Sequence, residues 1–253
     1  MKGGVSQPGA PGTGEGVVVI AGEGVLADEL REAATAAGYE ARSPHSPTGG
    51  VLPSLSIDCA SARPGTAGER GGGSGHRDSQ AGGAHLALCA GGSLSALDPG
   101  GSAVGFHVLP PFAEARLVEL TRGESSSPVA ASRAERFFEA LGKHTVWVGD
   151  APGLVLGRMV CQIINECAFA LGEGVGSAQD IDTGMRLGLS HPRGPMGWAD
   201  MIGLDHVLAV LEGLSDEYRE ERYRPAPALR QLVAAGRLGR AGGGGFLDYD
   251  PAD

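Results

Sequence analysis

Leu154-Val-Leu-Gly-Arg-Met-Val-Cys-Gln-Ile-Ile-Asn-Glu-Cys-Ala-Phe-Ala-Leu171 is an almost continuous apolar run that is long enough for a helix. Pro152 and Gly172 are the residue types expected at the start and just past the end of such a helix. A helix that is apolar on most of its circumference lies inside a domain or between two, so we expect a buried central helix with one structural unit on either side. Its polar residues form one narrow stripe at helical spacing: Arg158, Gln162, Asn165 and Glu166.

Length, charge and cysteine content limit the classes of protein that this chain can represent. The 253 residues fit one large domain or two small ones. The net charge of -10 and the pI near 5.2 argue against a nucleic-acid or anionic-membrane partner. No apolar stretch is long enough to span a bilayer, and the Gly/Pro-rich segment Met1–Gly16 does not resemble a signal peptide. The four cysteines show no zinc-site spacing, so we expect a soluble, cytoplasmic protein without a metal.

The first ordered segment has the pattern of a nucleotide-binding unit. Val17–Ile20 is a short buried-strand signal, and Asp28–Ala37 has the pattern of a helix. Between them lies Gly22-Glu-Gly24-Val-Leu-Ala27, a GxGxxA turn. A strand, a glycine turn and a helix open the dinucleotide-binding unit, in which the helix N-terminus faces a pyrophosphate. Gly22 and Gly24 therefore either contact a nucleotide or form a purely structural turn.

The rest of the first half is uneven in composition. Residues 44–83 are rich in Gly, Pro, Ser, Ala and Arg, and we predict that they are mostly disordered, because so little apolar surface cannot offset the entropy of ordering. An amphipathic helix is predicted at Pro128–Leu141. Residues 1–149 are thus predicted to form a reduced Rossmann-type α/β domain. Its further strands are expected at His85–Cys89, Ser102–Leu109, Arg116–Thr121 and Thr145–Val148.

After Gly174 the pattern is entirely helical. Ser177-Ala-Gln-Asp180 is a capping box that opens one helix, Asp205 is expected to cap another, and Phe246–Tyr249 is expected to dock as an aromatic segment. Residues 150–253 are thus predicted to form an all-α C-terminal dimerisation domain, and its wide apolar faces predict a homodimer. Two more helices are expected at Pro195–Ile202 and Pro227–Ala235.

Many short motifs over more than half of the chain occur in a recognisable order and spacing. They are Gly105–Pro111, Leu117–Glu119, Leu141–Lys143, Asp150–Leu154, Glu173–Gly174, Asp180–Thr183, Met185–Gly188, Gly194–Pro195, Ala199–Asp200, Gly203–Asp205, Tyr223–Pro225, Ala235–Arg240 and Gly245–Phe246. With these motifs the chain from Val104 onward resembles the L-3-hydroxyacyl-CoA dehydrogenases, in particular the 3-hydroxybutyryl-CoA dehydrogenase branch. The resemblance implies a Rossmann domain followed by a helical dimerisation domain, NAD as the cofactor and an acyl-CoA substrate.

The resemblance also implies a catalytic pair. The family uses a histidine that is followed twelve residues later by a glutamate, and His107 and Glu119 hold that spacing. Oxidation of a secondary alcohol needs a base that takes the hydroxyl proton while hydride leaves the carbon. An imidazole titrates near the working pH, and a carboxylate behind it orients the ring. Without the resemblance, His107 reads as an internal strand histidine and Glu119 as a surface charge.

The chain departs from the family at several functional positions. Pro110 and Gly157 each stand where the family has an asparagine, and the second of these asparagines lies beside the substrate. The family's catalytic serine falls on Gly92, and Ser93 next to it is the candidate replacement. The sequence also lacks an acid after the second strand for the ribose, and the helical segment that contacts coenzyme A.

Three hypotheses follow from these observations. The first is an NAD-dependent dehydrogenase that interconverts L-3-hydroxyacyl-CoA and 3-oxoacyl-CoA, with His107 as the base, Glu119 as its orienter, Ser93 as a further catalytic residue, and Gly22 and Gly24 as the pyrophosphate turn. The second is a catalytically impaired paralogue that acts as a dimerising binding or assembly subunit. The third is a non-redox acyl-thioester enzyme that kept the His–Glu pair and lost the nucleotide. An intact nucleotide turn favours the first.

Overall fold

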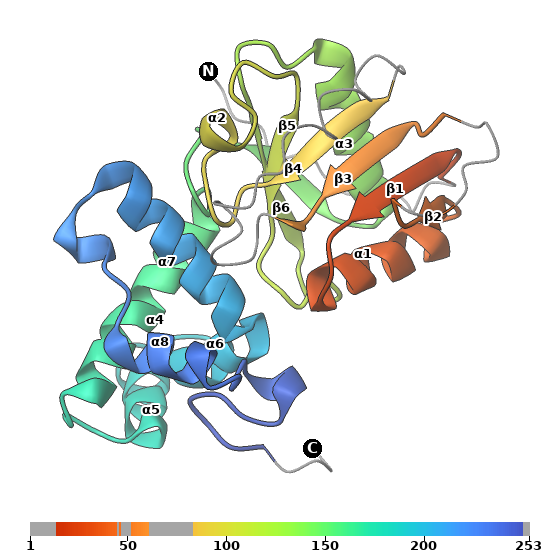
Figure 1. Cartoon of the computed structure of the whole chain (residues 1–253). Helices are drawn as coiled ribbons and strands as arrows, with labels where there is room; N and C mark the ends of the chain where they lie inside the picture. Colours follow the sequence, from red (N-terminus) through yellow and green to blue (C-terminus); the bar gives the residue numbers. More distant parts are fainter. Residues whose placement is uncertain (1–13, 45, 47–51, 61–82, 250–253) are drawn as a thin grey trace.

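A computed structural model of the chain describes residues 14–44, 46, 52–60 and 83–249, which form a sheet-containing half and a helical half (Figure 1). The elements of the first half are β1 (Val17–Ala21), α1 (Val25–Ala36), β2 (Glu40–Arg42), β3 (Leu55–Asp58), β4 (Ala84–Leu88), α2 (Leu94–Leu97), β5 (Val104–His107), β6 (Leu117–Arg122), α3 (Pro128–Ala140) and β7 (His144–Trp147). Those of the second are α4 (Leu156–Gly172), α5 (Ala178–Gly188), α6 (Pro195–Ile202), α7 (Leu204–Tyr218), η3 (Glu221–Tyr223), α8 (Pro227–Ala234) and η4 (Arg240–Gly242).

The strands form one seven-stranded sheet in the order β2-β1-β3-β4-β5-β6-β7. All neighbours are parallel except β5 and β6, which are antiparallel. Helix α1 packs against β1 and β2, while α3 packs against β4, β5 and β7. A mostly parallel sheet with crossover helices is the Rossmann type of architecture, so the predicted fold class of an α/β domain followed by helices is confirmed.

The prediction that residues 44–83 are mostly disordered is wrong for Leu55–Asp58. These residues form β3, an inner strand that pairs in parallel with β1 on one side and β4 on the other. Leu55 and Ile57 are 3% and 1% exposed, because alternate side chains of the strand enter the core. The Gly/Pro-rich composition around this short strand masks its signal. Residues 45, 47–51 and 61–82, which the same prediction covers, lie outside the described residues.

Helix α4 packs against α5, α6, α7 and α8 and is central to the helical half, whereas the sequence predicts a helix with one structural unit on either side. The prediction of burial on nearly every side is only partly right, since Val155 and Met159 at its start are 49% and 58% exposed. Of the polar stripe, Asn165 is buried, Arg158 and Gln162 are half-buried and Glu166 is exposed. Asn165 lies in that stripe: its Nδ2 donates to the Arg224 carbonyl at 2.9 Å and its Oδ1 accepts from the Ala226 N–H at 2.8 Å. The stripe therefore satisfies backbone groups of the segment between α7 and α8.

Two of the predicted helix starts can be compared directly with the structure. The capping box at the start of α5 is present, with the Ser177 hydroxyl and the Asp180 carboxylate each bonded to the other residue's N–H. The prediction that Asp205 caps a helix is wrong. Gly203 is the N-cap residue of α7, with φ at +99°, and Asp205 lies in the first turn. A glycine takes this position because the backbone there adopts a conformation that side chains disfavour.

Phe246–Tyr249 docks on the helical half through one buried carboxylate. Asp200, which is 2% exposed, accepts hydrogen bonds from the N–H groups of Phe246 and Leu247 at 2.8 Å each and from the Tyr249 hydroxyl at 3.1 Å. The predicted aromatic docking segment is therefore held by polar contacts to α6 and by packing of Phe246 and Leu247 against hydrophobic clusters.

We expect Asp200→Ala to lower the free energy of unfolding by about 3 kcal/mol, because it leaves three hydrogen-bond donors without their acceptor. The matched control is Asp248→Ala, whose side chain is 91% exposed and paired with Arg237 at the surface, with an expected change below about 1 kcal/mol. Urea unfolding of both variants measures the difference. Equal losses for the two variants would contradict this role of Asp200.

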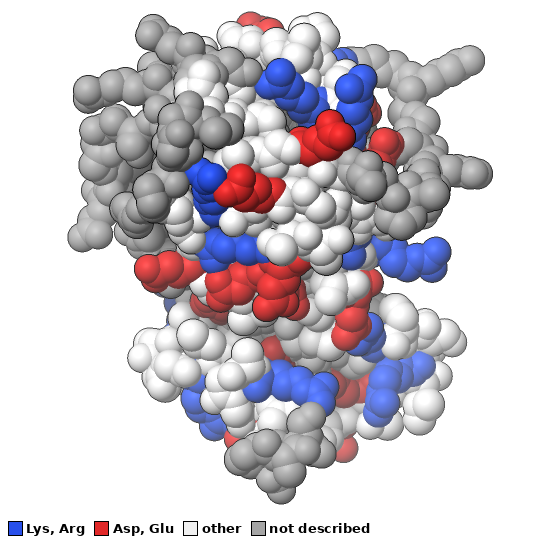
Figure 2. Space-filling view, turned by 90° about the vertical axis from the view of Figure 1, so that its right-hand side faces the viewer, with Lys and Arg blue, Asp and Glu red and all other residues white. Residues whose placement is uncertain are grey.

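Surface charge, helix length and possible metal ligands are the features relevant to nucleic-acid, membrane and metal partners. On the face shown in Figure 2, acidic side chains gather in a band across the middle of the molecule, with basic side chains above and below it. Among the helices that the structure describes, none combines the length and apolar character that crossing a membrane requires. The described residues likewise contain no group of three or more His, Cys, Asp or Glu side chains able to hold a metal ion.

Candidate active site

The pairing of β5 with β6 brings the predicted histidine and glutamate together. His107 and Glu119 are directly opposite each other in the antiparallel register, and they are 1% and 2% exposed. Side chains of opposed residues on neighbouring strands lie on the same face of the sheet. The twelve-residue spacing is thus a consequence of a short connection between two paired strands.

Glu119 uses its carboxylate to hold the start of α4. Its Oε2 accepts hydrogen bonds from the N–H groups of Val155 and Leu156 at 3.2 and 2.9 Å. Burial raises the pKa of Glu119, and the two N–H donors act in the opposite direction. A carboxylate at the first turn of a helix satisfies N–H groups that have no partner within the helix. Glu119 therefore fixes the beginning of the central helix relative to β6.

Gly157, one residue after these donors, lies directly against the imidazole of His107. A Cβ atom added at Gly157 would be 2.4 Å from Cε1 and 2.8 Å from Nε2 of His107, closer than side-chain contacts allow. The ring thus occupies the space that a side chain at position 157 would need. The glycine that replaces the family's asparagine is required by the present position of the histidine.

The hydrogen-bond partner of His107 is a second histidine rather than Glu119. Nε2 of His107 lies 3.2 Å from Nε2 of His206, which is in α7 and 5% exposed. Nδ1 of His107 is buried and has no hydrogen-bond partner among the described residues. The expected contact between the Glu119 carboxylate and the imidazole is thus not made in this structure. Sequence reasoning missed His206, because a histidine 99 residues away carries no local signal of contact with β5.

Burial keeps both imidazoles neutral. It lowers the pKa of His107 well below the ordinary value of 6.5, with His206 as a second cause, and lowers that of His206 to about 4. In the unfolded chain a histidine gains a proton below about pH 6.5, whereas folded His206 does not until about pH 4. Its contribution to stability is therefore complete above about pH 6.5 and is lost as the pH falls toward about 4.

We expect the stability of the wild type to fall with acidification more steeply than that of His206→Leu. The difference between the two proteins should change by about 3 kcal/mol over this range, in favour of the variant at low pH. Urea unfolding at neutral pH and near pH 4 measures it. Parallel stability curves for the two proteins would show that His206 is not buried in its neutral form.

Ser93 is buried near the start of α2. It is 1% exposed, and its hydroxyl lies 3.2 Å from that of Ser95. The Asp150 carboxylate, from the segment before α4, accepts the N–H groups of Leu94 and Ser95 at 2.7 and 2.9 Å. Ser93 is therefore held close to the junction of the two halves, although its described hydroxyl contact is with Ser95 and not with His107.

The glycine turn after β1 has the backbone that a phosphate-binding turn needs. Gly22 and Gly24 have φ values of +107° and +104°, a region that favours glycine. A Cβ atom added at Gly24 would meet nothing within 4 Å, so this turn leaves open space, whereas at Gly22 it would be 3.0 Å from Cys59. Among the described residues no side chain caps α1, which begins directly after Gly24. These features fit a dinucleotide pyrophosphate.

The segment between β5 and β6 is tied to α1 and to the turn between α3 and β7. It contains a cis peptide bond between Pro110 and Pro111, where the family has its asparagine before the proline. The Lys143 ammonium donates to the carbonyls of Phe112 and Ala115 at 2.7 and 2.8 Å. The Phe112 N–H in turn donates to Glu29 of α1. The turn that follows His107 is thus anchored to the nucleotide-side helix.

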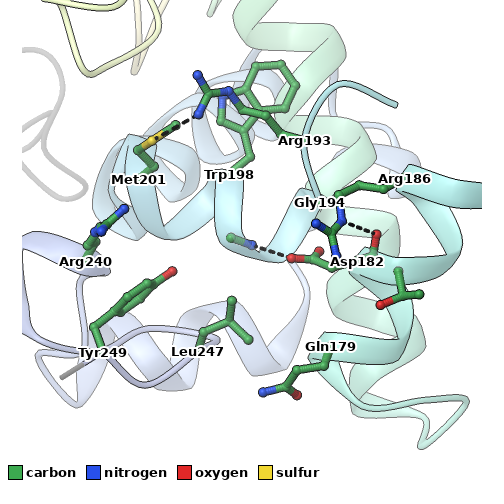
Figure 3. A pocket seen from close by; sticks show the side chains of 12 residues that line it. Gln179, Asp182, Arg186, Arg193, Gly194, Trp198, Met201, Arg240, Leu247 and Tyr249 are labelled. Atoms are coloured by element: carbon green, nitrogen blue, oxygen red, sulfur yellow. Dashed lines mark hydrogen bonds between the residues drawn. The ribbon is translucent and has the colours of Figure 1, made fainter. Parts of the chain in front are cut away.

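A separate cavity of about 540 Å³ lies in the helical half (Figure 3). Arg186, Arg193 and Arg240 surround it, and Trp198 and Tyr249 contribute aromatic walls. Arg193 also forms an ion pair with Glu114, in the segment between β5 and β6, at 2.7 Å. His107, Glu119, Ser93, Gly22 and Gly24 do not line this cavity.

Comparison with known proteins finds a family model that matches most of the helical half. Residues 153–249 match the family model described as 3-hydroxyacyl-CoA dehydrogenase, C-terminal domain. The helical half is thus similar to the C-terminal domain of the 3-hydroxyacyl-CoA dehydrogenase family. Among members with a curated name, the probable 3-hydroxybutyryl-CoA dehydrogenase of Bacillus subtilis is 41% identical over 147 residues, which are 58% of this chain and 51% of that protein. The 3-hydroxybutyryl-CoA dehydrogenase of Bradyrhizobium diazoefficiens is 38% identical over 146 residues, 58% of this chain and 50% of that protein.

The structural match to this family extends further along the chain. The crystal structure of (S)-3-hydroxybutyryl-CoA dehydrogenase from Ralstonia eutropha has a TM-score of 0.69 and 27% identity, and covers 92% of this chain and 99% of that one. In sequence, by contrast, the chain spans about half the length of the curated relatives it matches. The sheet half therefore keeps the architecture of the 3-hydroxyacyl-CoA dehydrogenases while its sequence diverges.

Proposed function

We propose that this chain is an NAD-dependent oxidoreductase that interconverts L-3-hydroxyacyl-CoA and 3-oxoacyl-CoA in acyl-CoA metabolism. The observation that carries the proposal is the buried, register-paired placement of His107 and Glu119 at the start of α4. The placement lies in the part of the chain that resembles the 3-hydroxybutyryl-CoA dehydrogenases. The match of residues 153–249 to the C-terminal domain of the 3-hydroxyacyl-CoA dehydrogenases supports it.

In this proposal His107 is the general base. It takes the proton of the substrate's 3-hydroxyl group, and the hydrogen on the same carbon leaves as hydride, so the C–O bond becomes a carbonyl. Burial keeps the imidazole of His107 neutral, and a neutral imidazole with a free lone pair is the form that accepts a proton. Glu119 contributes by fixing the first turn of α4, which carries Gly157 beneath the ring. Ser93 is the proposed donor to a substrate oxygen, supported by its buried hydroxyl near the junction.

The residues of the glycine turn fit the cofactor. Gly22 and Gly24 would hold the pyrophosphate through the backbone at the uncapped start of α1. When bound, NAD supplies the nicotinamide ring that accepts the hydride. The second-strand end, where an acid commonly holds the ribose, instead carries Arg42, whose guanidinium bonds to Glu40. The affinity of the protein should therefore be measured for both NADH and NADPH.

We also propose a homodimer formed through the helical half, located in the cytoplasm. Support for the dimer comes from large apolar side chains that are exposed there: Val155, Met159, Val175, Leu187 and Leu189. Support for a reducing compartment comes from the four cysteines, all of which are free and buried.

The test of the proposed reaction is its stoichiometry. Purified protein is incubated with NAD and either L- or D-3-hydroxybutyryl-CoA, and NADH and the 3-oxoacyl thioester are quantified together. Equal amounts of both products from the L substrate, and much less from the D substrate, are expected. Thioester hydrolysis without NADH would overturn the proposal and favour a non-redox acyl-thioester enzyme. Binding without any product would favour the assembly-subunit hypothesis.

A further inference from the structure

The inference concerns His206, to which neither the catalytic pair nor the family motifs assign a role, and it rests on the proposed function. His206 lies on α7, and His107 lies at the end of β5, so their contact joins the helical half to the sheet. The two Nε2 atoms are 3.2 Å apart, and the ring centroids are 5.3 Å apart with the planes at 44°. Both residues are at most 5% exposed. No solvent competes for this contact.

Helix α7 holds His206 firmly in place. Its neighbours Val207 and Val210 are fully buried, and Gly213 packs against the loop that precedes α2, where an added Cβ atom would be 2.8 Å from the Gly91 carbonyl. His206 and Gly213 are seven residues apart and therefore lie on one face of the helix. That face of α7 covers both His107 and the loop that leads to Ser93.

The contact restricts the protons on the two rings. A hydrogen bond between two imidazole nitrogens needs one donor and one acceptor, so one Nε2 carries hydrogen and the other does not. Nδ1 of His107 is buried without a partner. A proton on Nδ1 would be a buried N–H donor without an acceptor, which folded proteins avoid. The favoured tautomer therefore carries its hydrogen on Nε2 of His107. This N–H donates to His206, and the lone pair on Nδ1 stays free.

Glu119 does not fill this role directly, because its Oε2 is bonded to the N–H groups of Val155 and Leu156. Gly157 closes another side of the ring without offering any side-chain group. His206 is thus the one side chain, among the described residues, that is hydrogen-bonded to the base.

We propose that His206 is the positioning residue of His107, which accepts a hydrogen bond from Nε2 and leaves Nδ1 as the nitrogen that takes the substrate's hydroxyl proton. In the step, the O–H and C–H bonds of the alcohol break, the proton forms a bond to Nδ1, and the hydride reduces the nicotinamide ring. The imidazolium that results still donates its Nε2–H to neutral His206. His206 thereby takes the place that a carboxylate holds behind a catalytic histidine.

Two variants separate this role from simple packing. His206→Leu keeps an apolar volume but removes the acceptor, whereas His206→Gln keeps a side-chain acceptor. With L-3-hydroxybutyryl-CoA and NAD, we expect kcat to fall at least about tenfold in the leucine variant, with KM changed less than about twofold, and to recover in the glutamine variant. Full activity of His206→Leu, or equal impairment of both variants with intact folding, would overturn the proposal.

The tautomer of His107 can be measured on the whole chain without substrate, and therefore without any turnover. Nitrogen-15 spectra of histidine-labelled protein, with His107 assigned through His107→Gln, report which ring nitrogen carries hydrogen. We expect His107 to be protonated on Nε2 in the wild type and to change its tautomer balance in His206→Leu. A His107 protonated on Nδ1 in the wild type would refute the role of His206. If the wild type shows no turnover, the proposed function fails, and these spectra still decide the inference.

Discussion

His107→Gln should lower kcat for the oxidation of L-3-hydroxybutyryl-CoA by about 10²- to 10⁴-fold, the range that a general base contributes. Glutamine keeps polar atoms of similar reach but cannot take up a proton near neutral pH. Affinity for NADH should stay unchanged, because the glycine turn at Gly22 and Gly24 belongs to a different part of the sheet edge. Steady-state kinetics and an equilibrium NADH titration on the same preparation measure both quantities.

The matched control is His191→Gln in the helical half. His191 bonds through its ring to the Arg193 carbonyl and packs against Trp198, away from β5. It should retain the kcat of the wild type within about twofold. If His107→Gln kept more than about a tenth of the wild-type kcat, His107 would not be the base.

Gly157→Ala should have the second-largest effect, because it places a Cβ atom 2.4 Å from Cε1 of His107. The buried ring has to move, and displacement of a catalytic group by about 1 Å can cost about 100-fold in rate. Overpacking should also lower the free energy of unfolding by about 1–3 kcal/mol. Steady-state kinetics and urea unfolding measure the two losses.

Gly184→Ala, in α5, is the control for the helical glycine itself. An added Cβ atom there meets nothing within 4 Å, so alanine should stabilise the helix by about 0.5–1 kcal/mol and leave kcat unchanged. A Gly157→Ala variant with wild-type kcat would mean that the imidazole does not need its present position for the reaction.

The local features of this structure can be predicted from the sequence. Helix α6 has the predicted bounds Pro195–Ile202, and the capping box of α5 is formed as its spacing predicts. The pairing of His107 with Glu119 follows from two strands close together in the chain, so a twelve-residue spacing is enough to predict their proximity. These features depend on periodicity, capping and short connections, which a single sequence displays.

The features that sequence reasoning missed depend on distant contacts. β3 is a short strand whose order comes from pairing with β1 and β4 on both sides, and its own composition does not show this. The contact of His206 with His107 depends on how α7 packs against the sheet. The same contact explains a departure from the family pattern, since the loss of the asparagine at Gly157 makes room for the ring that His206 holds.

The most direct measurement of whether this chain is a dehydrogenase joins cofactor binding to turnover in one titration. NADH is added to the wild-type protein and followed by fluorescence, and acetoacetyl-CoA is then added while the loss of NADH is recorded. We predict saturable NADH binding, followed by NADH consumption that depends on acetoacetyl-CoA and disappears in His107→Gln. A folded protein that neither binds NADH nor consumes it would contradict the proposal.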